Sequence, residues 1–249
     1  KENMGYHESL TEGRNAVLEA FRSGKTVDRL FVLDGCQDGP VKTILREAKK
    51  QDTMVQYVKK ERLDQLSETK NHQGVIAYCA ACEYAEVSDI LENAKKKGEA
   101  PFIVLLDGIE DPHNLGAIIR TANQAGAHGV IIPKRRAVGL TATVARTSAG
   151  AVNYTPVAKV TNLVTVMEDL KKEGMWFVCA DMDGEEMYSL NLKGPIGLVI
   201  GNEGEGVSRL VKEHCDMVAS IPMKGDIDSL NASVAMGVLA YEIVRQRRF

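Results

Sequence analysis

The feature that most constrains the fold is a series of short apolar segments, each followed by a helical segment, in residues 101–249. Apolar runs of about four to eight residues are typical of buried strands. The predicted strands are 102–106, 129–132, 175–180, 196–200 and 217–221, and the predicted helices are 114–125, 140–148, 161–172, 206–213 and 229–246. This alternation predicts an α/β fold with a mostly parallel sheet covered on both faces. Such sheets bind their ligands at the carboxyl ends of the strands.

The first part of the chain alternates in the same way on a smaller scale. Helices are predicted over 15–22, 41–50 and 60–66, and strands over 29–33, 54–58 and 74–79. A unit of about 75 residues lies within the usual range of domain sizes. The segment 85–100, which contains Lys95-Lys96-Lys97, is expected to be a solvated helix end and linker rather than a binding patch. We therefore expect a small α/β domain over 1–84, a linker over 85–100 and a larger α/β domain over 101–249.

The charge of the chain excludes one broad class of nucleic-acid-binding protein. Its 31 Lys and Arg residues are balanced by 34 Asp and Glu residues, which gives a formal net charge of −3. A protein that binds nucleic acid through bulk positive charge is strongly basic, so any such role here must depend on local patches.

Nothing in the sequence points to a membrane or to an oxidising compartment. No apolar run approaches the roughly 18 residues that span a bilayer, and residues 1–10 contain no apolar signal segment. Five cysteines are an odd number for a disulfide framework and fit a reducing compartment better. These features predict a cytoplasmic protein.

Several common catalytic and metal-binding motifs are absent from the sequence. It has no G-x-x-x-x-G-K-[ST] phosphate loop, no G-x-G-x-x-G dinucleotide loop and no H-E-x-x-H zinc motif. Cys79 and Cys82 form a single C-x-x-C pair, whereas a structural zinc site needs four ligands. The five histidines have no ligand spacing. We expect structural thiols and no bound metal.

The first of three polar loops follows the strand 102–106. It leads into a helix expected to begin near Asn114, which is a favourable N-cap residue. Gly116 would allow the close approach of another backbone, and Arg120 lies about one and two-thirds turns into the helix. The alternative interpretation is an ordinary capped connection with a surface arginine.

The second loop follows the strand 196–200 and is rich in glycine. Gly201, Gly204 and Gly206 are expected to leave bare backbone N–H groups close to a helix N-terminus, where a ligand could approach. Glu203 and Glu205 would repel a phosphate, so a cationic or neutral nucleoside-like ligand fits better. The alternative is a tight turn followed by an acidic helix start.

The third loop joins the strand 217–221 to the last helix. Asp228 or Ser229 is expected to cap that helix, and Asn231 and Ser233 to lie in its first turns, where they are poor helix formers. The rest of the helix is apolar around most of its circumference, which predicts burial on all sides. We expect it to lie between its own sheet and a partner subunit; the alternative is burial under the first domain.

At these three loops the chain resembles the SpoU, or TrmH-type, branch of the SPOUT RNA methyltransferases. The family motif N-x-G-x-x-x-R corresponds to residues 114–120, and G-x-E-x-x-G corresponds to residues 201–206. The motif I-P-M followed by S-L-N-x-S corresponds to residues 221–223 and 229–233. Within the family, the chain is most similar to the subgroup that 2′-O-methylates guanosine in ribosomal RNA, which carries an additional N-terminal RNA-binding domain.

The resemblance implies a fold and a cofactor that the sequence pattern alone does not. It implies a C-terminal trefoil knot, S-adenosylmethionine as the methyl donor and a homodimer formed through the C-terminal domain. The residues expected to bind the cofactor are Gly201, Ile221, Met223, Leu230 and Ser233. The positively charged sulfonium of this donor would fit the acidic loop at 201–206 better than a phosphate would.

The resemblance also assigns catalytic roles. It implies that Arg120 is catalytic and is assisted by Asn114, Glu203, Ser229 and Asn231. Arginine is almost always protonated, so Arg120 acts either as a strongly perturbed base or as a stabiliser of the developing alkoxide.

RNA contacts are expected in both domains. The loops at 13–17 and 71–75 resemble those of the family's RNA-binding domain and suggest Arg14, Asn15 and His72. In the larger domain the candidates are Lys134, Arg135, Arg136 and Arg146, although the basic run 134–136 could equally be a solvated turn. The expected substrate is a guanosine ribose in large-subunit (23S) ribosomal RNA. The alternatives are transfer RNA, another ribosomal nucleoside, or a non-catalytic RNA-binding assembly factor.

Overall fold

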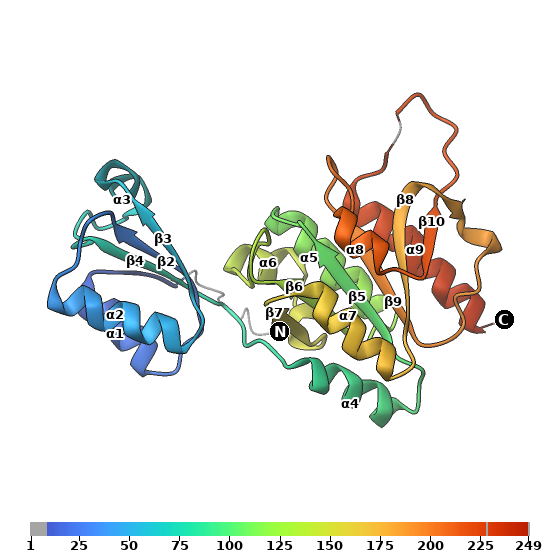
Figure 1. Cartoon of the computed structure of the whole chain (residues 1–249), viewed down its shortest axis with the longest axis horizontal. Coiled ribbons are helices and arrows are strands. Elements are labelled where there is room, and N and C mark those ends of the chain that lie inside the picture. Colours follow the sequence, from blue (N-terminus) through green and yellow to red (C-terminus); the bar gives the residue numbers. More distant parts are fainter. Residues whose placement is uncertain (1–8, 228, 249) are drawn as a thin grey trace. The chain divides into compact units, whose positions relative to one another are not determined.

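The computed structural model describes residues 9–227 and 229–248. The chain divides into two compact units, one made of Lys1–Glu83 with Gly139–Ala142 and the other of Tyr84–Val138 with Thr143–Phe249. Each unit has its own sheet and its own apolar core (Figure 1). The predicted α/β fold is confirmed.

The first unit is a four-stranded mixed sheet with helices on both faces. Its strands β1 (Ser9–Glu12), β2 (Val27–Leu33), β3 (Met54–Val58) and β4 (Val75–Cys79) lie in the order β1-β4-β2-β3. Helices α1 (Arg14–Arg22) and α2 (Gly39–Lys50) cover one face, and α3 (Lys60–Leu66) covers the other (Figure 1). Every element predicted here is present, and only the four-residue edge strand β1 was missed.

The second unit is built on a six-stranded sheet in which all neighbouring strands are parallel. The strand order is β10-β8-β9-β5-β6-β7. The strands are β5 (Phe102–Asp107), β6 (Gly129–Pro133), β7 (Val157–Val160), β8 (Trp176–Glu186), β9 (Ile196–Gly201) and β10 (Met217–Ser220). The predicted parallel sheet is therefore confirmed, with one strand, β7, that the sequence analysis did not find.

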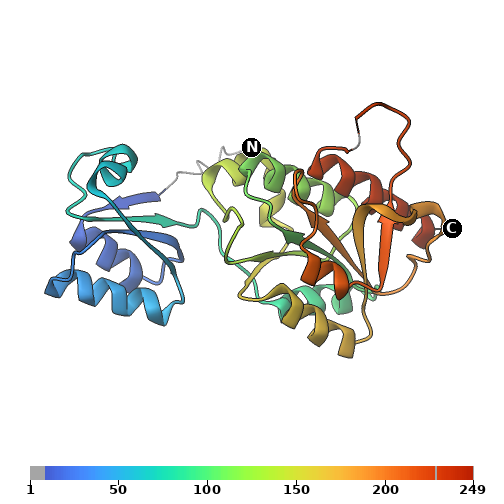
Figure 2. The ribbon, with the colours of Figure 1, turned by 45° about the horizontal axis from the view of Figure 1, so that its top comes forward.

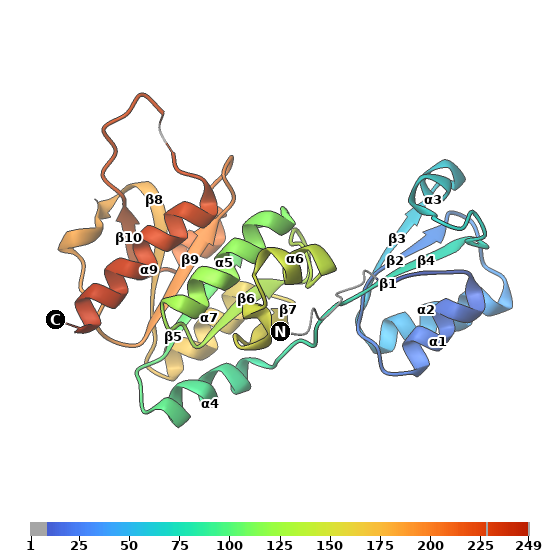
Figure 3. The same ribbon diagram turned by 180° about the vertical axis from the view of Figure 1, so that it is seen from behind.

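Helices cover both faces of this sheet. Helices α5 (Pro112–Gln124) and α9 (Ala232–Arg248) lie side by side on one face (Figure 3). Helices α4 (Val87–Lys97), α7 (Leu163–Lys172) and α8 (Arg209–Glu213) lie on the other, where they share a core with strand residues such as Leu105, Phe177 and Val199. Short helices α6 (Ala142–Thr147), η1 (Ala151–Asn153) and η2 (Met187–Ser189) complete the unit.

The segment 85–100 is not a linker, because it forms a packed helix. Ile90 of α4 is fully buried in the core of the second unit. A Cβ atom at Gly129 of β6 would lie 2.5 Å from Ile90 Cγ1, so glycine is needed for this close packing. Only Lys95, Lys96 and Lys97 match the expected solvated helix end, because all three are exposed.

The last helix is anchored at its end by Arg247. Its guanidinium donates hydrogen bonds to the backbone carbonyls of Ala100 (3.0 Å), Pro101 (2.9 Å) and Gly194 (2.8 Å). It also lies over the ring of Phe102, 5.4 Å from the centroid. The final turn of the chain thus holds the start of β5 and the segment before β9.

Within the single chain, one side of α9 is buried and the other is not, so its predicted burial against a partner subunit stays a prediction. Met236, Leu239, Ala240 and Ile243 are buried against the sheet and α5. The opposite side keeps apolar residues at the surface, since Val234 and Tyr241 are each 50% exposed.

Candidate active site

Sheet topology brings two of the three predicted loops together. Strands β5 and β9 are parallel neighbours, and their last residues, Asp107 and Gly201, lie opposite each other. The third loop starts at β10, which β8 separates from β9. Its residues 221–227 extend beyond the carboxyl ends of the strands (Figure 2), and the chain then returns to Asn231 beside the other two loops.

Three polar side chains, one from each loop, form a hydrogen-bonded cluster. The Nδ2 group of Asn114 donates to Oε1 of Glu203 at 3.0 Å. The Nδ2 group of Asn231 donates to Oδ1 of Asn114 at 3.0 Å and also to Oε1 of Glu203. We call Asn114, Glu203 and Asn231 the triad cluster. All three side chains were predicted site residues, and the structure places them in direct contact.

The helix caps differ from the prediction in both helices that contribute to the cluster. Asp111 caps α5 by accepting a hydrogen bond from the backbone N–H of His113, and Pro112 occupies the first turn, so Asn114 is not the cap. Asn231 caps α9, since its Oδ1 accepts from the N–H groups of Ser233 (3.0 Å) and Val234 (3.3 Å).

The residues proposed as caps of α9 have other positions. Ser229 is exposed and lies two residues before the actual cap, while Asp228 falls outside the described residues. The hydroxyl of Ser233 donates to Oδ1 of Asn231 at 2.5 Å. Ser233 therefore supports the orientation of a triad-cluster side chain from the first turn of α9.

The glycine-rich loop satisfies its own backbone groups, which contradicts the expectation of bare N–H groups. Oδ1 of Asn202 accepts from the N–H groups of Gly204 (3.0 Å) and Glu205 (2.6 Å). The Gly206 N–H donates to the Asn202 carbonyl at 3.0 Å, and α8 begins only at Arg209. This loop is therefore a closed turn that presents Glu203.

Two glycines of the motifs are required by close backbone packing. A Cβ atom at Gly201 would lie 2.0 Å from the carbonyl carbon of Gly206, where the loop folds back on itself. A Cβ atom at Gly116 would lie 1.8 Å from Oγ1 of Thr147 in α6. The close approach predicted for Gly116 is thus an approach between two helices.

A cavity of about 500 Å³ opens beside the triad cluster. Most of its lining comes from the first two loops and includes four carboxylate side chains, those of Glu110, Asp111, Glu203 and Glu205. Asn114 and, from the segment after β6, Arg136 also line it. The excess of carboxylates favours a cationic or neutral ligand and disfavours an anionic one.

Asp107, at the end of β5, contacts both the segment after the glycine-rich loop and the cavity-lining residue Arg136. It is buried and accepts a hydrogen bond from the Ser208 N–H at 2.8 Å. A guanidinium nitrogen of Arg136 lies 3.7 Å from its other carboxylate oxygen. Arg136, predicted as an RNA contact, therefore lines the cavity and faces a buried carboxylate.

Arg120 lies apart from the triad cluster. An α-helix rises about 1.5 Å and turns about 100° per residue, so Arg120 is about 9 Å further along α5 than Asn114 and on another side of the helix. Its side chain is exposed. Within the described part of the chain, no hydrogen bond or ion pair joins it to the cluster.

The residues predicted to bind the cofactor occupy two regions. Gly201 and Ser233 lie next to the triad cluster, at the end of β9 and in the first turn of α9. Ile221 and Met223 lie at the start of the loop after β10, and Leu230 lies at its end. Met223 is 41% exposed.

The remaining predicted RNA contacts of the second unit lie after β6 and in α6. Arg135 is exposed, whereas Lys134 is half-buried. Arg146 is exposed and donates to the Thr143 hydroxyl at 3.1 Å.

In the first unit, two predicted RNA contacts have structural partners. His72 is buried: its Nδ1 accepts from the Gly74 N–H at 3.0 Å, and its Nε2 lies 3.0 Å from Asp64 Oδ1. Both ring nitrogens are thus engaged inside the unit, so His72 shapes its loop rather than presenting a free nitrogen. Arg14 pairs with Asp38 at 2.5 Å, and Asn15 is exposed.

The sequence analysis missed Glu12, the last residue of β1. Its carboxylate accepts hydrogen bonds from the Ser67 hydroxyl, the N–H groups of Glu68 (2.7 Å) and Thr69 (3.1 Å), and the Thr69 hydroxyl (3.0 Å). Burial raises the pKa of Glu12, but these hydrogen bonds outweigh it and hold the pKa below its usual value. Glu12 stands next to the predicted loop 13–17, which was the only signal in the sequence that could have indicated it.

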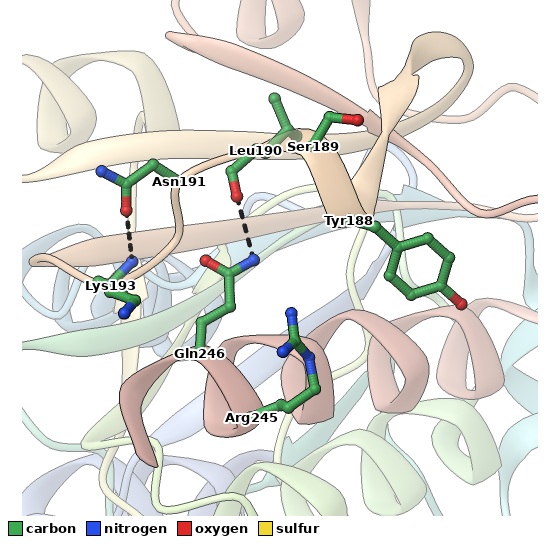
Figure 4. Close-up of a pocket in the computed structure, with 7 residues that line it drawn as sticks. All are labelled: Tyr188, Ser189, Leu190, Asn191, Lys193, Arg245 and Gln246. Carbon is green, nitrogen blue, oxygen red and sulfur yellow. Dashed lines mark hydrogen bonds between the residues drawn. The ribbon is translucent and has the colours of Figure 1, made fainter. Parts of the chain in front are cut away.

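A second cavity, of about 370 Å³, lies at the other end of α9 (Figure 4). Its lining includes Tyr188, Lys193, Arg245 and Gln246. Arg245 forms a two-pronged ion pair with Glu242, and Gln246 donates to the Leu190 carbonyl at 3.0 Å. None of its lining residues belongs to the three motif loops.

The five cysteines are free. Burial raises the pKa of the Cys82 thiol, which keeps it protonated. Within residues 9–227 and 229–248, no group of three or more His, Cys, Asp or Glu side chains is arranged to hold a metal ion. Nor does this part of the chain contain a helix that is both long and apolar enough to cross a membrane.

Comparison with known proteins identifies both units. Residues 101–241 match the model of the SpoU rRNA Methylase family, and residues 10–85 match the model for RNA 2′-O ribose methyltransferase substrate binding. The chain belongs to the SpoU rRNA methylase family. The resemblance found in the sequence is thereby confirmed at the level of an RNA methyltransferase with a separate substrate-binding unit.

Relatives and solved structures agree with this SpoU assignment. The chain is 49% identical over 246 residues to YacO of Bacillus subtilis, which is assigned to the TrmH family of tRNA/rRNA methyltransferases, and 98% of each chain is covered. The AdoMet-bound rRNA methyltransferase from Sinorhizobium meliloti has a similar structure, with a TM-score of 0.60, 25% identity and coverage of 95% of this chain and 86% of that one.

A shorter SpoU structure matches only part of the chain. The TrmH/SpoU tRNA-modifying enzyme of A. aeolicus gives a TM-score of 0.55 and 27% identity, and the match covers 64% of this chain and 84% of that one. These relatives do not distinguish the guanosine-specific ribosomal RNA subgroup that the sequence analysis favoured.

Proposed function

We propose that this protein transfers a methyl group from S-adenosylmethionine to the 2′-hydroxyl of a guanosine ribose in 23S ribosomal RNA. The observation that carries the proposal is the triad cluster, in which Asn114, Glu203 and Asn231 come from three separate loops and meet at the carboxyl ends of the strands. This is the place where open α/β sheets bind their ligands. The intact cluster also favours an enzyme over a non-catalytic assembly factor.

The residues of the site fit the proposed methyl donor. The loop 201–206 uses its N–H groups internally, so it is no phosphate cradle. The neighbouring cavity is lined by four carboxylates, which favour a cation. When bound, the donor supplies a methyl group on a positively charged sulfonium. Gly201, Ile221, Met223, Leu230 and Ser233 are the residues that we propose hold it.

The protein must hold the ribose and assist loss of its hydroxyl proton. We assign the triad cluster, with Ser229 near it, to orienting the reactants, since its hydrogen bonds fix three loops relative to one another. We assign Arg120 to the developing alkoxide, because a guanidinium stays protonated and stabilises negative charge.

The extent of the structural matches favours ribosomal RNA over transfer RNA. The rRNA methyltransferase structure matches 95% of the chain, whereas the tRNA-modifying enzyme matches 64%. A substrate-binding unit before the SpoU unit is therefore in keeping with a ribosomal substrate. Transfer RNA remains the second candidate, since YacO carries a tRNA/rRNA name.

The substrate is tested by transfer of a tritiated methyl group to purified 23S ribosomal RNA and to bulk transfer RNA, both taken from cells that lack this protein. Mapping of the modified ribose then identifies the base. Labelled guanosine in 23S RNA supports the full proposal. Label confined to transfer RNA, or to another nucleoside, would contradict the proposed substrate but would still support the proposed methyl transfer.

We further propose a cytoplasmic homodimer with a trefoil knot in the second unit. The exposed apolar side of α9, with Val234 and Tyr241, and the neighbouring α5 offer a surface for a second copy. Five free cysteines suit a reducing compartment. Light scattering of the purified protein tests the dimer, and Tyr241→Lys should weaken it.

RNA contacts are proposed in both units. Asn15 and Arg14 of the first unit, and Arg135, Lys134 and Arg146 of the second, present cationic or amide groups at or near the surface. With a formal net charge of −3, binding should depend on a few such groups and should weaken only modestly with salt.

A further inference from the structure

The loop of residues 67–74, between α3 and β4, displays polar side chains at the surface, and the inference drawn from it rests on the proposed function. We propose that Lys70 is an RNA-binding residue and that Glu12 is a positioning residue that acts through it. Neither residue belongs to the motifs found in the sequence.

One side of this loop is fixed by Glu12. Its carboxylate accepts four hydrogen bonds from the three consecutive residues Ser67, Glu68 and Thr69. The same groups continue the network, because the Ser67 hydroxyl accepts from the Lys70 N–H at 2.8 Å and the Thr69 hydroxyl accepts from the Asn71 N–H at 3.3 Å. The carboxylate therefore determines the backbone up to the tip of the loop.

The backbone of Lys70 has an uncommon conformation. Its φ is +62°, in the left-handed region that residues other than glycine rarely adopt. Such a conformation persists where the surrounding contacts determine it. Here those contacts are the hydrogen bonds that Glu12 organises, so the direction of the Lys70 side chain depends on Glu12.

The other side of the loop is fixed independently. Gln73 also has a positive φ, of +51°, and its carbonyl accepts from Nε of Arg14 at 3.1 Å. His72 is buried between Asp64 and the Gly74 N–H. The exposed residues Lys70, Asn71 and Gln73 are therefore displayed on a loop held at both ends.

Lys70 differs from its cationic neighbour Arg14. Arg14 is neutralised by Asp38, whereas no acidic side chain among the described residues pairs with Lys70. An exposed, unpaired ammonium on a rigid loop can bind an RNA phosphate with little loss of conformational entropy. The amide of Asn71 beside it, and the Nε2 group of Gln73, can hydrogen-bond unpaired base edges, whereas Oε1 of Gln73 already accepts from the Arg14 N–H at 3.1 Å. RNA is thus the ligand that this surface fits.

The first experiment measures binding of the full chain to 23S ribosomal RNA made by transcription, over about 50 to 200 mM KCl. Lys70→Ala should weaken binding roughly tenfold, as expected for loss of one charge-assisted hydrogen bond. The slope of log affinity against log salt should fall by about 0.7 to 0.9. Methyl transfer at saturating RNA should keep its kcat. Lys49→Ala, which removes an exposed lysine at the far end of α2, should change neither quantity.

The second experiment separates positioning from general stability. Glu12→Gln should weaken RNA binding about as much as Lys70→Ala, with kcat unchanged at saturating RNA. Combined with Lys70→Ala it should cause no further loss, since its effect passes through Lys70. Full additivity of the two losses would mean that Glu12 acts only on the fold and would overturn its assignment.

The outcomes distinguish this inference from the proposed function. If the wild type methylates RNA and Lys70→Ala binds it with unchanged affinity and salt slope, Lys70 is not a contact and the inference fails alone. If the wild type neither binds nor methylates ribosomal or transfer RNA, the proposed function fails, and the inference fails with it.

Discussion

Glu12 and Glu203 are both accessible to solvent, and each accepts several hydrogen bonds. They differ in which parts of the chain these hydrogen bonds join. Glu12 bonds three consecutive residues of one loop, Ser67, Glu68 and Thr69. Glu203 bonds Asn114 and Asn231, which lie 89 and 28 residues away in the sequence. The first carboxylate gives one loop its shape, whereas the second fixes three loops relative to one another. A substitution in the first unit should therefore act locally, and one in the second should affect the whole site.

The largest effect is expected from Arg120→Ala. A loss of methyl transfer in this variant would show that the reaction depends on a residue of the second unit. Methyl transfer should fall about 100-fold to 1,000-fold, the usual cost of removing one charge stabiliser. Affinity for S-adenosylmethionine, measured by calorimetry, should stay within about twofold of wild type, since Arg120 is not among the residues proposed to hold the donor. Arg209→Ala, at an exposed position of α8, is the control. Near-normal turnover of Arg120→Ala would contradict the assignment.

Gly201→Ala should show that the second unit depends on backbone packing as well as on Glu203. The new methyl group would overlap the backbone of Gly206, so the free energy of unfolding should fall by about 1–3 kcal/mol. Gly204→Ala is the matched control, because the nearest atom to its new methyl group would be Asn202 Oδ1 at 3.8 Å, an ordinary contact distance. Denaturant unfolding of both variants measures the difference. Equal stability of the two would mean that the loop can open without cost.

Glu203→Ala tests directly whether one carboxylate joins the three loops. The variant leaves the amide groups of Asn114 and Asn231 without their shared acceptor, which should cost about 1 kcal/mol of stability. Methyl transfer should fall roughly tenfold or more, because misplacement of reacting groups is costly. Glu205→Ala, two residues away in the same loop, should have a smaller effect on both stability and activity. If the two variants behave alike, the triad cluster does not organise the site.

The smallest effect is expected from the pH dependence of Glu12. Its pKa in the folded protein lies below the ordinary value of 4.5, so its stabilising contribution is fully present above pH 4.5 and is lost as the pH falls through the folded pKa. Glu12→Gln lacks this contribution at every pH. The stability difference between wild type and Glu12→Gln, followed by urea unfolding, should therefore be constant above about pH 5.5 and shrink below pH 4.5. A difference that grows in acid would contradict this account.

The sequence predicted the site more fully than its local details. The rule that ligands bind at the carboxyl ends of parallel strands indicated which loops to consider, and the resemblance to the SpoU family then selected Asn114, Glu203 and Asn231 within them. The helix caps could not be predicted in the same way. Asp111 and Asn114 are both good caps, and the choice of Asp111 depends on Pro112 beginning the helix.

Features set by tertiary contact were the ones that the sequence did not predict. The strand β7 has four residues, including Lys159, and is a strand because it pairs with the edge of β6. Helix α4 resembled a linker, since only Ile90 and Ala94 are buried in it. Glu12 has no local partner, and its role depends on a loop 55 residues away.

The hydrogen bonds of Arg247 have a consequence for how the chain is made. Strands β1–β4 and helices α1–α3 of the first unit lie within residues 9–79, so they can fold while the ribosome is still synthesising the rest, and Gly139–Ala142 joins this unit later. The second unit has its first strand held by the guanidinium of Arg247, which lies 146 residues after Pro101. Its first strand therefore waits without this clamp until the last turn of α9 has left the exit tunnel.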